Sequence, residues 1–427
     1  MGQTPGRTLH RSLGLGDAVT IGLGAMLGAG VFAVWGPATA AAGGAVLLAL
    51  GLAAAVDVCN ALSSAALAAR FPSAGGTYVY GRERLGQVWG YLAGWCFVVG
   101  KTASCAAMAM TAGAYLVPGA ERVAAVVAVV LVTALNLVGV QRSVAASRVI
   151  VTIVVCALLG IAVAAVWPRP SGVLLDGSQL VAPPDGIWGV LQAAGLLFFA
   201  FAGYARIATL GEEVRDPARV IPRAVVIALG SILALYAVVG VVVLGVLGAE
   251  ATAGSSTPVA DTAAVVWGSG WAWVVRAVVG LAALGALLNL VLGISRTALA
   301  MARDAYLPQV VAVTAGPQAV PRVAELAVGV VVLVVVLVAD LRGAIGFSSF
   351  GVLLYYAVAN AAAFTLRHEW PAGRWVPLIG LVGCLALVLA LPPTSVLVGA
   401  AVVAAGGAAY LIKGFGRRGP GEGGSTS

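Results

Sequence analysis

Three ionisable side chains fall well inside long apolar runs of the sequence: Asp57, Lys101 and Arg206. Burying a charge in lipid costs several kcal/mol, so such residues are candidates for function. Lys101 is unusual because Lys413 is the only other lysine in a chain rich in arginine. A buried lysine can lose its proton near neutral pH, whereas arginine stays protonated. Lys101 is therefore a candidate proton carrier.

Asp57 and Lys101 occur in neighbouring apolar runs that are predicted to cross in opposite directions. Counted from the ends of these runs, the two side chains reach a similar depth near the midplane. They could form an ion pair. The alternative is that Asp57 makes a local hydrogen bond and faces away from Lys101.

A second chemical feature is the glycine-rich stretch from Gly22 to Phe32, which has four glycines within nine residues. Each glycine costs roughly 1 kcal/mol against alanine in a helix interior, so this backbone is expected to be unwound or closely approached. In a membrane, unwound backbone is tolerated only beside a cavity. The stretch is a candidate ligand site; the alternative is close helix packing, with Gly24 and Gly28 as a small-residue pair.

The composition indicates the elements that position these residues. The chain has 427 residues, of which 61% are hydrophobic and 9% charged, and its mean hydropathy is +1.04. Such a chain belongs in a lipid bilayer, where about 20 apolar residues span the hydrocarbon as a helix. We predict an all-α membrane protein with twelve spans, at about 17–41, 44–69, 88–116, 122–140, 148–167, 187–211, 222–248, 271–301, 323–340, 344–366, 375–391 and 394–412.

The net charge of +8 is spread over short connecting segments, which argues against a nucleic-acid partner. With twelve spans, the basic connections all fall on one side, together with the N-terminal tail. By the positive-inside rule both termini are cytoplasmic, in a multi-pass protein of the cell membrane. The five cysteines lie in apolar runs without metal-ligand spacing, so we predict no metal site.

A second interruption runs from Leu196 to Arg206, five spans after the first and in the opposite direction. Paired interrupted spans in two five-span halves are typical of inverted-repeat transporters. The predicted parts are a cytoplasmic tail (1–16), a first repeat (17–167), a second repeat (187–366), two further spans (375–412) and a disordered cytoplasmic tail (413–427).

Four stretches carry a resemblance to a known family: Gly28–Phe32, Arg70–Tyr78, Gly211–Arg223 and Ser295–Pro308. Together they resemble the amino acid–polyamine–organocation (APC) superfamily of amino acid permeases. The resemblance implies a LeuT-like 5+5 inverted repeat in which helices 1 and 6 are broken.

In that family the broken helices hold the α-amino acid part of the substrate. Free N–H groups in the first break would attract a carboxylate, and carbonyls of both breaks would accept from the ammonium group. Phe199 lies where the family often has an aromatic gate, and Asn289 faces the first break from span 8. The substrate-binding candidates are Ala25, Met26, Gly28, Ala29, Gly30, Phe199, Ala202, Gly203 and Asn289.

The coupling and gating candidates are Lys101, Asp57, Phe199, Arg206 and Glu213. Some family members carry a coupling lysine in span 5, where this chain has Cys156, so Lys101 is expected to supply the titratable charge from span 3. Arg206 either holds an acid such as Glu213 at the inner gate or reaches a substrate carboxylate.

Ser295 and Thr297 suit a sodium site, yet no acidic residue accompanies them in the sequence, so a proton is the expected coupling ion. No cofactor is expected. No catalytic constellation is found, so an enzyme is not expected.

We therefore expect a permease that imports an amino acid by alternating access and that prefers neutral or anionic substrates to cationic ones. The alternatives are an exchanger without proton coupling and a permease-like amino acid sensor. The sequence leaves the particular amino acid and the oligomeric state open.

Overall fold

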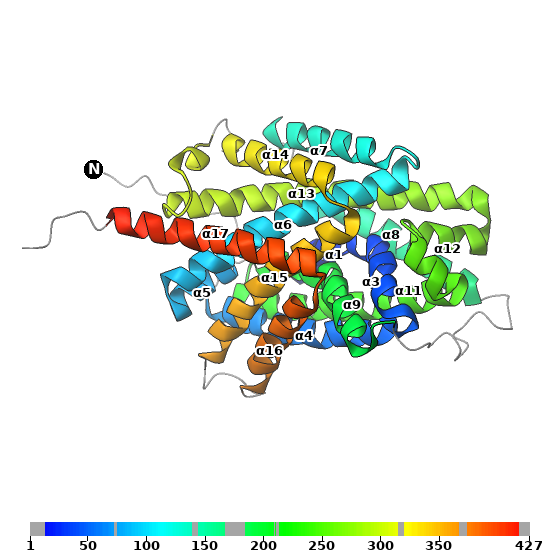
Figure 1. Cartoon of the computed structure of the whole chain (residues 1–427), viewed down its shortest axis with the longest axis horizontal. Coiled ribbons are helices and arrows are strands. Elements are labelled where there is room, and N and C mark those ends of the chain that lie inside the picture. The colour runs from blue at the N-terminus through cyan, green and yellow to red at the C-terminus, as the bar shows by residue number, and fades with distance from the viewer. Residues whose placement is uncertain are drawn as a thin grey trace, which may run out of the picture.

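The structure, a computed structural model, describes residues 13–71, 75–138, 144–166, 184–208, 210, 213–314, 320–366 and 374–417. These residues are almost entirely helical. An isolated β-bridge joins Leu13 to Val214. Long helices run roughly parallel to the longest axis of the molecule (Figure 1).

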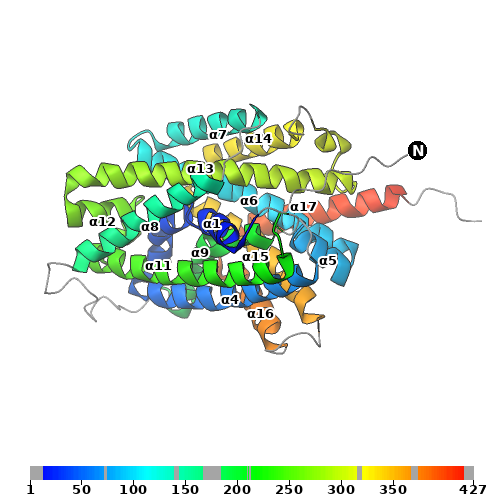
Figure 2. The ribbon, with the colours of Figure 1, turned by 180° about the vertical axis from the view of Figure 1, so that it is seen from behind.

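Two ends of this bundle are used below as reference points. The short helix α5 (Thr77–Leu85) and the C-terminal end of α17 (Pro393–Arg417) lie at one end, and α12 (Pro258–Trp267) lies at the other (Figures 1 and 2). We call them the α5 end and the α12 end.

The first span is interrupted, as its glycines predict. Helix α1 (Leu15–Met26) stops, and helix α2 (Gly30–Ala33) begins after three residues in turn conformation. Helix α3 (Trp35–Ala42) and the 3-10 turn η1 (Gly43–Ala45) then lead into α4 (Val46–Arg70). The chain therefore leaves regular α-helix where Gly28 and Gly30 weaken it.

The second predicted interruption is also present. Helix α9 (Gly186–Phe201) passes into the 3-10 turn η3 (Ala202–Tyr204), and α10 (Ala205–Ala208) follows. A 3-10 segment within a helix leaves backbone groups with poorer hydrogen bonds than an α-helix gives them. Both breaks thus offer polar backbone in the middle of an apolar bundle.

Each of the twelve predicted ranges contains helix within the described residues. The remaining long helices are α6 (Gln87–Leu116), α7 (Glu121–Val138), α8 (Val144–Val166), α11 (Pro217–Gly254), α13 (Ser269–Arg303), α14 (Arg322–Val338), α15 (Leu341–Phe364) and α16 (Trp375–Ala390). Within the described residues, ten helices are long and apolar enough to cross a membrane. Helices α14 and α16, of 17 and 16 residues, are shorter.

Several predicted boundaries need correction. The region after α4, predicted as a loop through Tyr78, already holds the start of α5, and the connection 249–270 holds the end of α11 and all of α12. The expected disordered tail from 413 is wrong for its first residues, because α17 continues to Arg417. Residues 418–427 and most of the connection 168–186 lie outside the described residues.

Helix α6 lies at the centre and packs against α13 on one side and α15 on the other. Its middle is a run of small side chains, so neighbouring helices approach closely. This central position brings Lys101 beside both breaks.

Candidate functional site

The two breaks lie directly against each other. A Cβ on Gly30 would stand 2.5 Å from the Cα of Ala200, and one on Gly203 would stand 2.6 Å from the carbonyl carbon of Ala25. Real Cβ contacts are not that short, so glycine is required at both positions for this backbone approach. By contrast, a Cβ on Gly24 would meet only the Val151 side chain at 3.5 Å, an ordinary contact.

Tyr236 of α11 ties the two breaks together. Its buried hydroxyl group lies 2.7 Å from the Met26 carbonyl oxygen and 3.1 Å from that of Ala200, and its ring packs on Phe201. The hydroxyl has a single proton to donate, which these two carbonyls share. The sequence analysis missed Tyr236; a tyrosine in the middle of an apolar run was the available signal.

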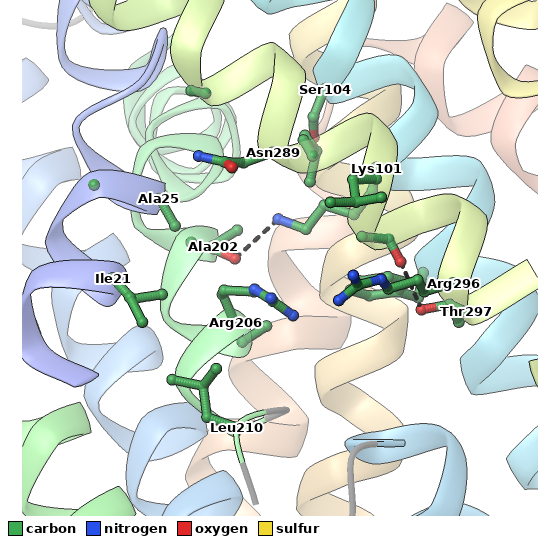
Figure 3. Close-up of a pocket in the computed structure, with 18 of the residues that line it drawn as sticks. Ile21, Ala25, Lys101, Ser104, Ala202, Arg206, Leu210, Asn289, Arg296 and Thr297 are labelled. Atoms are coloured by element: carbon green, nitrogen blue, oxygen red, sulfur yellow. Dashed lines mark hydrogen bonds between the residues drawn. The ribbon is translucent and has the colours of Figure 1, made fainter. Parts of the chain in front are cut away.

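Lys101 reaches the second break from α6. Its ammonium group donates to the Ala202 carbonyl oxygen at 2.9 Å, and its side chain is 6% exposed (Figure 3). Within the described residues no ion pair joins Lys101 to Asp57, so the pair that the sequence allowed does not form. The partner of Lys101 is therefore a backbone carbonyl group of the 3-10 turn rather than the Asp57 carboxylate.

Asp57 is completely buried in α4, near enough to the second break for its charge to act on Lys101 and on Tyr204. Neither of its carboxylate oxygens has a hydrogen-bond partner within 3.5 Å in the part of the chain that the structure describes. The alternative of a local hydrogen bond therefore also finds no support.

A cavity of about 1060 Å³ runs from the two breaks toward the α5 end. Seven of the predicted substrate-binding residues line it: Ala25, Met26, Gly30, Phe199, Ala202, Gly203 and Asn289. The other two, Gly28 and Ala29, do not line it and are buried against neighbouring helices. Their roles in binding remain predictions.

The three phenylalanines of the second break face different ways. Phe198 packs edge-on against Tyr356 and Phe201 against Tyr236, so both belong to the core. Phe199 alone of the three lines the cavity. This is the position that a gate residue requires.

Arginine side chains from two helices project into the cavity. Arg206 of α10 and Arg296 of α13 both line it, and Figure 3 shows them on opposite sides of the space below Lys101. The charges of Glu213 and Arg296 both act on Arg206. On sequence alone Arg296 was not a site candidate and appeared only within the stretch Ser295–Pro308. Its position inside an apolar run was the signal that could have identified it.

The mouth of the cavity lies between α5 and the end of α13. Arg82 pairs with Asp304 at 3.0 Å, and the Tyr78 hydroxyl donates to the same carboxylate. Burial and the neighbouring Asp304 carboxylate raise the pKa of Tyr78 well above its ordinary value. This cluster lies on the edge of the bundle where α5 begins.

Glu325 of α14 bears on the expectation that no acidic residue accompanies Ser295. Its side chain is 0% exposed, and the Ser295 hydroxyl donates to it at 2.7 Å. An acidic residue therefore does accompany Ser295, although the sequence separates them by 30 residues. The reason given for disfavouring sodium is wrong. Within the described residues no group of three or more metal-binding side chains occurs.

Comparison with known proteins decides the family. Residues 13–411 match the family model described as "Amino acid permease", which is nearly the whole chain. The chain belongs to the amino acid permease family. The resemblance to the APC superfamily is thereby confirmed.

Relatives of this permease are transporters. An uncharacterized transporter of Mycobacterium tuberculosis is 56% identical over 410 residues, covering 95% of this chain and 92% of its own. The branched-chain amino acid permease BcaP of Bacillus subtilis is 26% identical over 395 residues, with 86% and 83% covered. The vacuolar cationic amino acid transporter 2 of Arabidopsis thaliana is 28% identical over 409 residues, with 88% and 63% covered.

These matches make the protein an amino acid transporter with many membrane-crossing helices. Membership of this family implies a small-molecule substrate. Family membership points to transport rather than to enzymatic activity.

Proposed function

We propose that this permease imports an amino acid across the cytoplasmic membrane by alternating access, driven by protons, and that it prefers neutral or anionic substrates to cationic ones. The observation that carries the proposal is the contact between the Lys101 ammonium group and the Ala202 carbonyl oxygen. Through this contact the buried Lys101 lies at the wall of the cavity and beside the second helix break.

The proposed architecture is a twelve-span, LeuT-like 5+5 inverted repeat. It is supported by two breaks that occur five spans apart and pack backbone to backbone, as paired broken helices of such transporters do. The basic side chains Arg82, Arg84 and Arg303 gather at the α5 end. We therefore take the α5 end as cytoplasmic, with both termini on that side.

With this orientation the cavity faces the cytoplasm. Toward the α12 end the first break is closed by Tyr115, whose hydroxyl donates to the Phe32 carbonyl oxygen at 2.9 Å. Trp35 is also completely buried there. The structure then corresponds to an inward-facing state, from which substrate leaves toward the α5 end.

Substrate binding relies on backbone groups of the breaks. The N–H groups of Gly28 and Ala29 make no backbone hydrogen bond among the described residues, at the start of α2 where a carboxylate is favoured. Neither residue lines the cavity in this structure, so their contact with the substrate carboxylate stays a prediction. The Ala202 carbonyl oxygen is the corresponding acceptor for an ammonium group, and Lys101 now occupies it. A carbonyl oxygen has two lone pairs, so a substrate ammonium group can share this acceptor with Lys101.

Lys101 also supplies a route to coupling. A charged Lys101 attracts a substrate carboxylate, and two opposite unit charges about 6 Å apart at an effective dielectric constant of about 20 attract by about 3 kcal/mol. Protonation of Lys101 and binding of a neutral or anionic amino acid therefore favour each other, as proton-driven import requires. A side chain with its own positive charge is disfavoured for the same reason.

The test is uptake into liposomes under imposed proton and sodium gradients. We expect an inward proton gradient to drive accumulation by the unmodified protein, and Lys101→Gln to lose this dependence. Lys101→Arg keeps the charge but cannot release it, so this variant should also lose proton dependence while still rejecting cationic amino acids. Arg84→Gln, which removes a charge outside the cavity, is the matched control.

Two outcomes would overturn the proposal. One is a monodisperse Lys101→Gln protein with unchanged pH dependence and unchanged substrate preference. The other is uptake that depends strictly on internal substrate or on sodium, which would make the protein an exchanger or a sodium symporter. Binding without any flux would indicate a sensor.

A further inference from the structure

A buried carboxyl group lies behind the wall of the cavity. Glu325, in the first turn of α14, is completely buried, and the Ser295 hydroxyl of α13 donates to one of its carboxylate oxygens at 2.7 Å. The side chain of Asn136 in α7 also interacts with this carboxyl group. Asn136 lines the cavity, whereas Glu325 does not. Asn136 thus connects the buried carboxyl group to the cavity.

Two oxygen atoms of this cluster lack a hydrogen-bond donor. Within the described residues, neither Oε2 of Glu325 nor the amide oxygen of Asn136 has a partner, and both atoms are buried. An ionised carboxylate and an amide oxygen only accept hydrogen bonds, so these two atoms cannot satisfy each other. The nearby hydroxyl of Thr133 lies against Gly329, one turn further along α14, and bonds to neither of them. The cluster is therefore one donor short.

The charged surroundings of Glu325 come from two neighbouring helices. Helix α14 packs against α6, α7, α13 and the 3-10 turn η4 (Gln309–Ala312), and Figures 1 and 2 show α7, α13 and α14 side by side. Among the described residues, the titratable or charged side chains that interact electrostatically with Glu325 are Cys105 of α6 and Arg296 of α13. The charged residues of α7 are both at its other end, and η4 has none.

These surroundings act on the carboxyl group in opposite directions. Burial in a low-dielectric interior disfavours a charged carboxyl group, whereas a hydrogen-bond donor and a nearby positive charge favour it. Glu325 has burial on one side of this balance, and the Ser295 hydroxyl and the Arg296 charge on the other. Opposed influences of this kind are what a group that takes up and releases a proton requires.

One added proton completes the cluster. On Oε2 of Glu325 it turns an acceptor into a donor, and the amide oxygen of Asn136 is the acceptor that it meets. The Ser295 hydroxyl keeps its bond to the other carboxylate oxygen. A proton needs no space of its own, whereas a metal ion needs a shell of several oxygen ligands. The packing around Glu325 thus suits a proton better than a sodium ion.

We infer that Glu325 is a proton-binding site of this permease, and that its proton exchanges with water in the cavity beside Asn136. The proton leaves a hydronium ion, forms the Oε2–H bond and returns to water when that bond breaks. The inference rests on the proposed proton-driven transport and names the residue that releases the proton toward the α5 end. Lys101 keeps its proposed role at the second break, and Cys105, one turn after it in α6, interacts with both groups.

Infrared difference spectroscopy of the purified protein between alkaline and acidic pH detects protonation of a buried carboxyl group. We expect a band that the unmodified protein gains on acidification and that Glu325→Gln lacks. Ser295→Ala removes a donor to the charged form, so the pH midpoint of this band should rise by about one unit or more. Glu250→Gln changes an exposed acid of α11 outside the cavity and is the matched control, which should keep the band.

Transport in liposomes tests whether this proton is used. Glutamine has the shape of a protonated glutamate side chain but cannot release a proton. Glu325→Gln should therefore lose accumulation driven by an inward proton gradient, while it still exchanges internal for external amino acid with unchanged substrate preference. Retained exchange also shows that the variant is folded. Lys101→Gln, by contrast, should change the substrate preference as well.

Several results would overturn the inference. They are an infrared band that persists in Glu325→Gln, a band that only Asp57→Asn removes, and proton-driven accumulation that survives in Glu325→Gln. A band that responds to sodium at constant pH would make Glu325 a sodium ligand and would also refute the proton assignment. The proposed function fails separately, if the unmodified protein accumulates no amino acid in a proton gradient. The band would then still show whether Glu325 binds a proton.

Discussion

The contact between the two breaks gives the sharpest test of the structure, through Gly203→Ala. The new Cβ would stand 2.6 Å from both the carbonyl carbon and the oxygen of Ala25, and 2.7 Å from Cγ of Met26. These separations are roughly 0.8 Å short of ordinary contact. Two of the three opposing atoms are backbone, so no side-chain rotation relieves the overlap.

The expected cost follows from this geometry. Overpacking in a close-packed interior costs about 1–3 kcal/mol, and a clash with backbone belongs to the upper part of that range. The matched variant is Gly24→Ala, where the Cβ meets only Val151 at 3.5 Å. There alanine should gain up to about 1 kcal/mol of helix propensity. The two substitutions are therefore expected to change stability in opposite directions.

The assay is equilibrium unfolding of the purified variants in mixed micelles, followed by binding of the best ligand. Gly203→Ala should be less stable than Gly24→Ala by about 2–4 kcal/mol, the sum of the two effects. It should also bind ligand more weakly, because the breaks cannot keep their approach. Equal stability of the two variants would refute the claim that these glycines bring the breaks into contact.

Two further substitutions test groups around the cavity. Tyr236→Phe removes the hydroxyl shared by Met26 and Ala200, so it should lower the free energy of unfolding by about 1–3 kcal/mol in the same assay. Tyr78→Phe should destabilise the protein near neutral pH through loss of the bond to Asp304. Because the pKa of Tyr78 is raised in the folded state, its contribution is complete below the unfolded pKa of about 10 and is lost as the pH rises above it.

Controls distinguish these effects from general ones. Tyr410→Phe removes a hydroxyl from a ring cluster at the α5 end and should change stability by less than about 0.5 kcal/mol. If Tyr236→Phe behaves like Tyr410→Phe, the hydroxyl bridge between the breaks is not a stabilising feature. For Tyr78, the difference in stability between the unmodified protein and the phenylalanine variant should shrink in alkaline titration. A difference independent of pH would contradict the raised pKa.

The sequence by itself determined where the helices run and where two of them break. An apolar run of membrane length has few stable structures in lipid other than a helix, because every backbone N–H and C=O group must be hydrogen-bonded within the segment. Glycine clusters in the first span and the Gly203 region in the sixth therefore marked the breaks directly. The family resemblance rested on these same local stretches, and the family comparison confirmed it.

Only the tertiary structure decided which polar groups meet. From the sequence, a pair between Lys101 and Asp57 was possible because both lie at a similar depth. Depth does not fix the direction in which a helical side chain points. The observed partner is the Ala202 carbonyl, a backbone group with no sequence signature. Likewise Glu325 and Ser295, far apart in the chain, meet only because α14 packs on α13. In helices that are apolar on every side, sequence periodicity does not show which face points inward. The rotation and packing of the helices therefore determine which polar groups line the cavity.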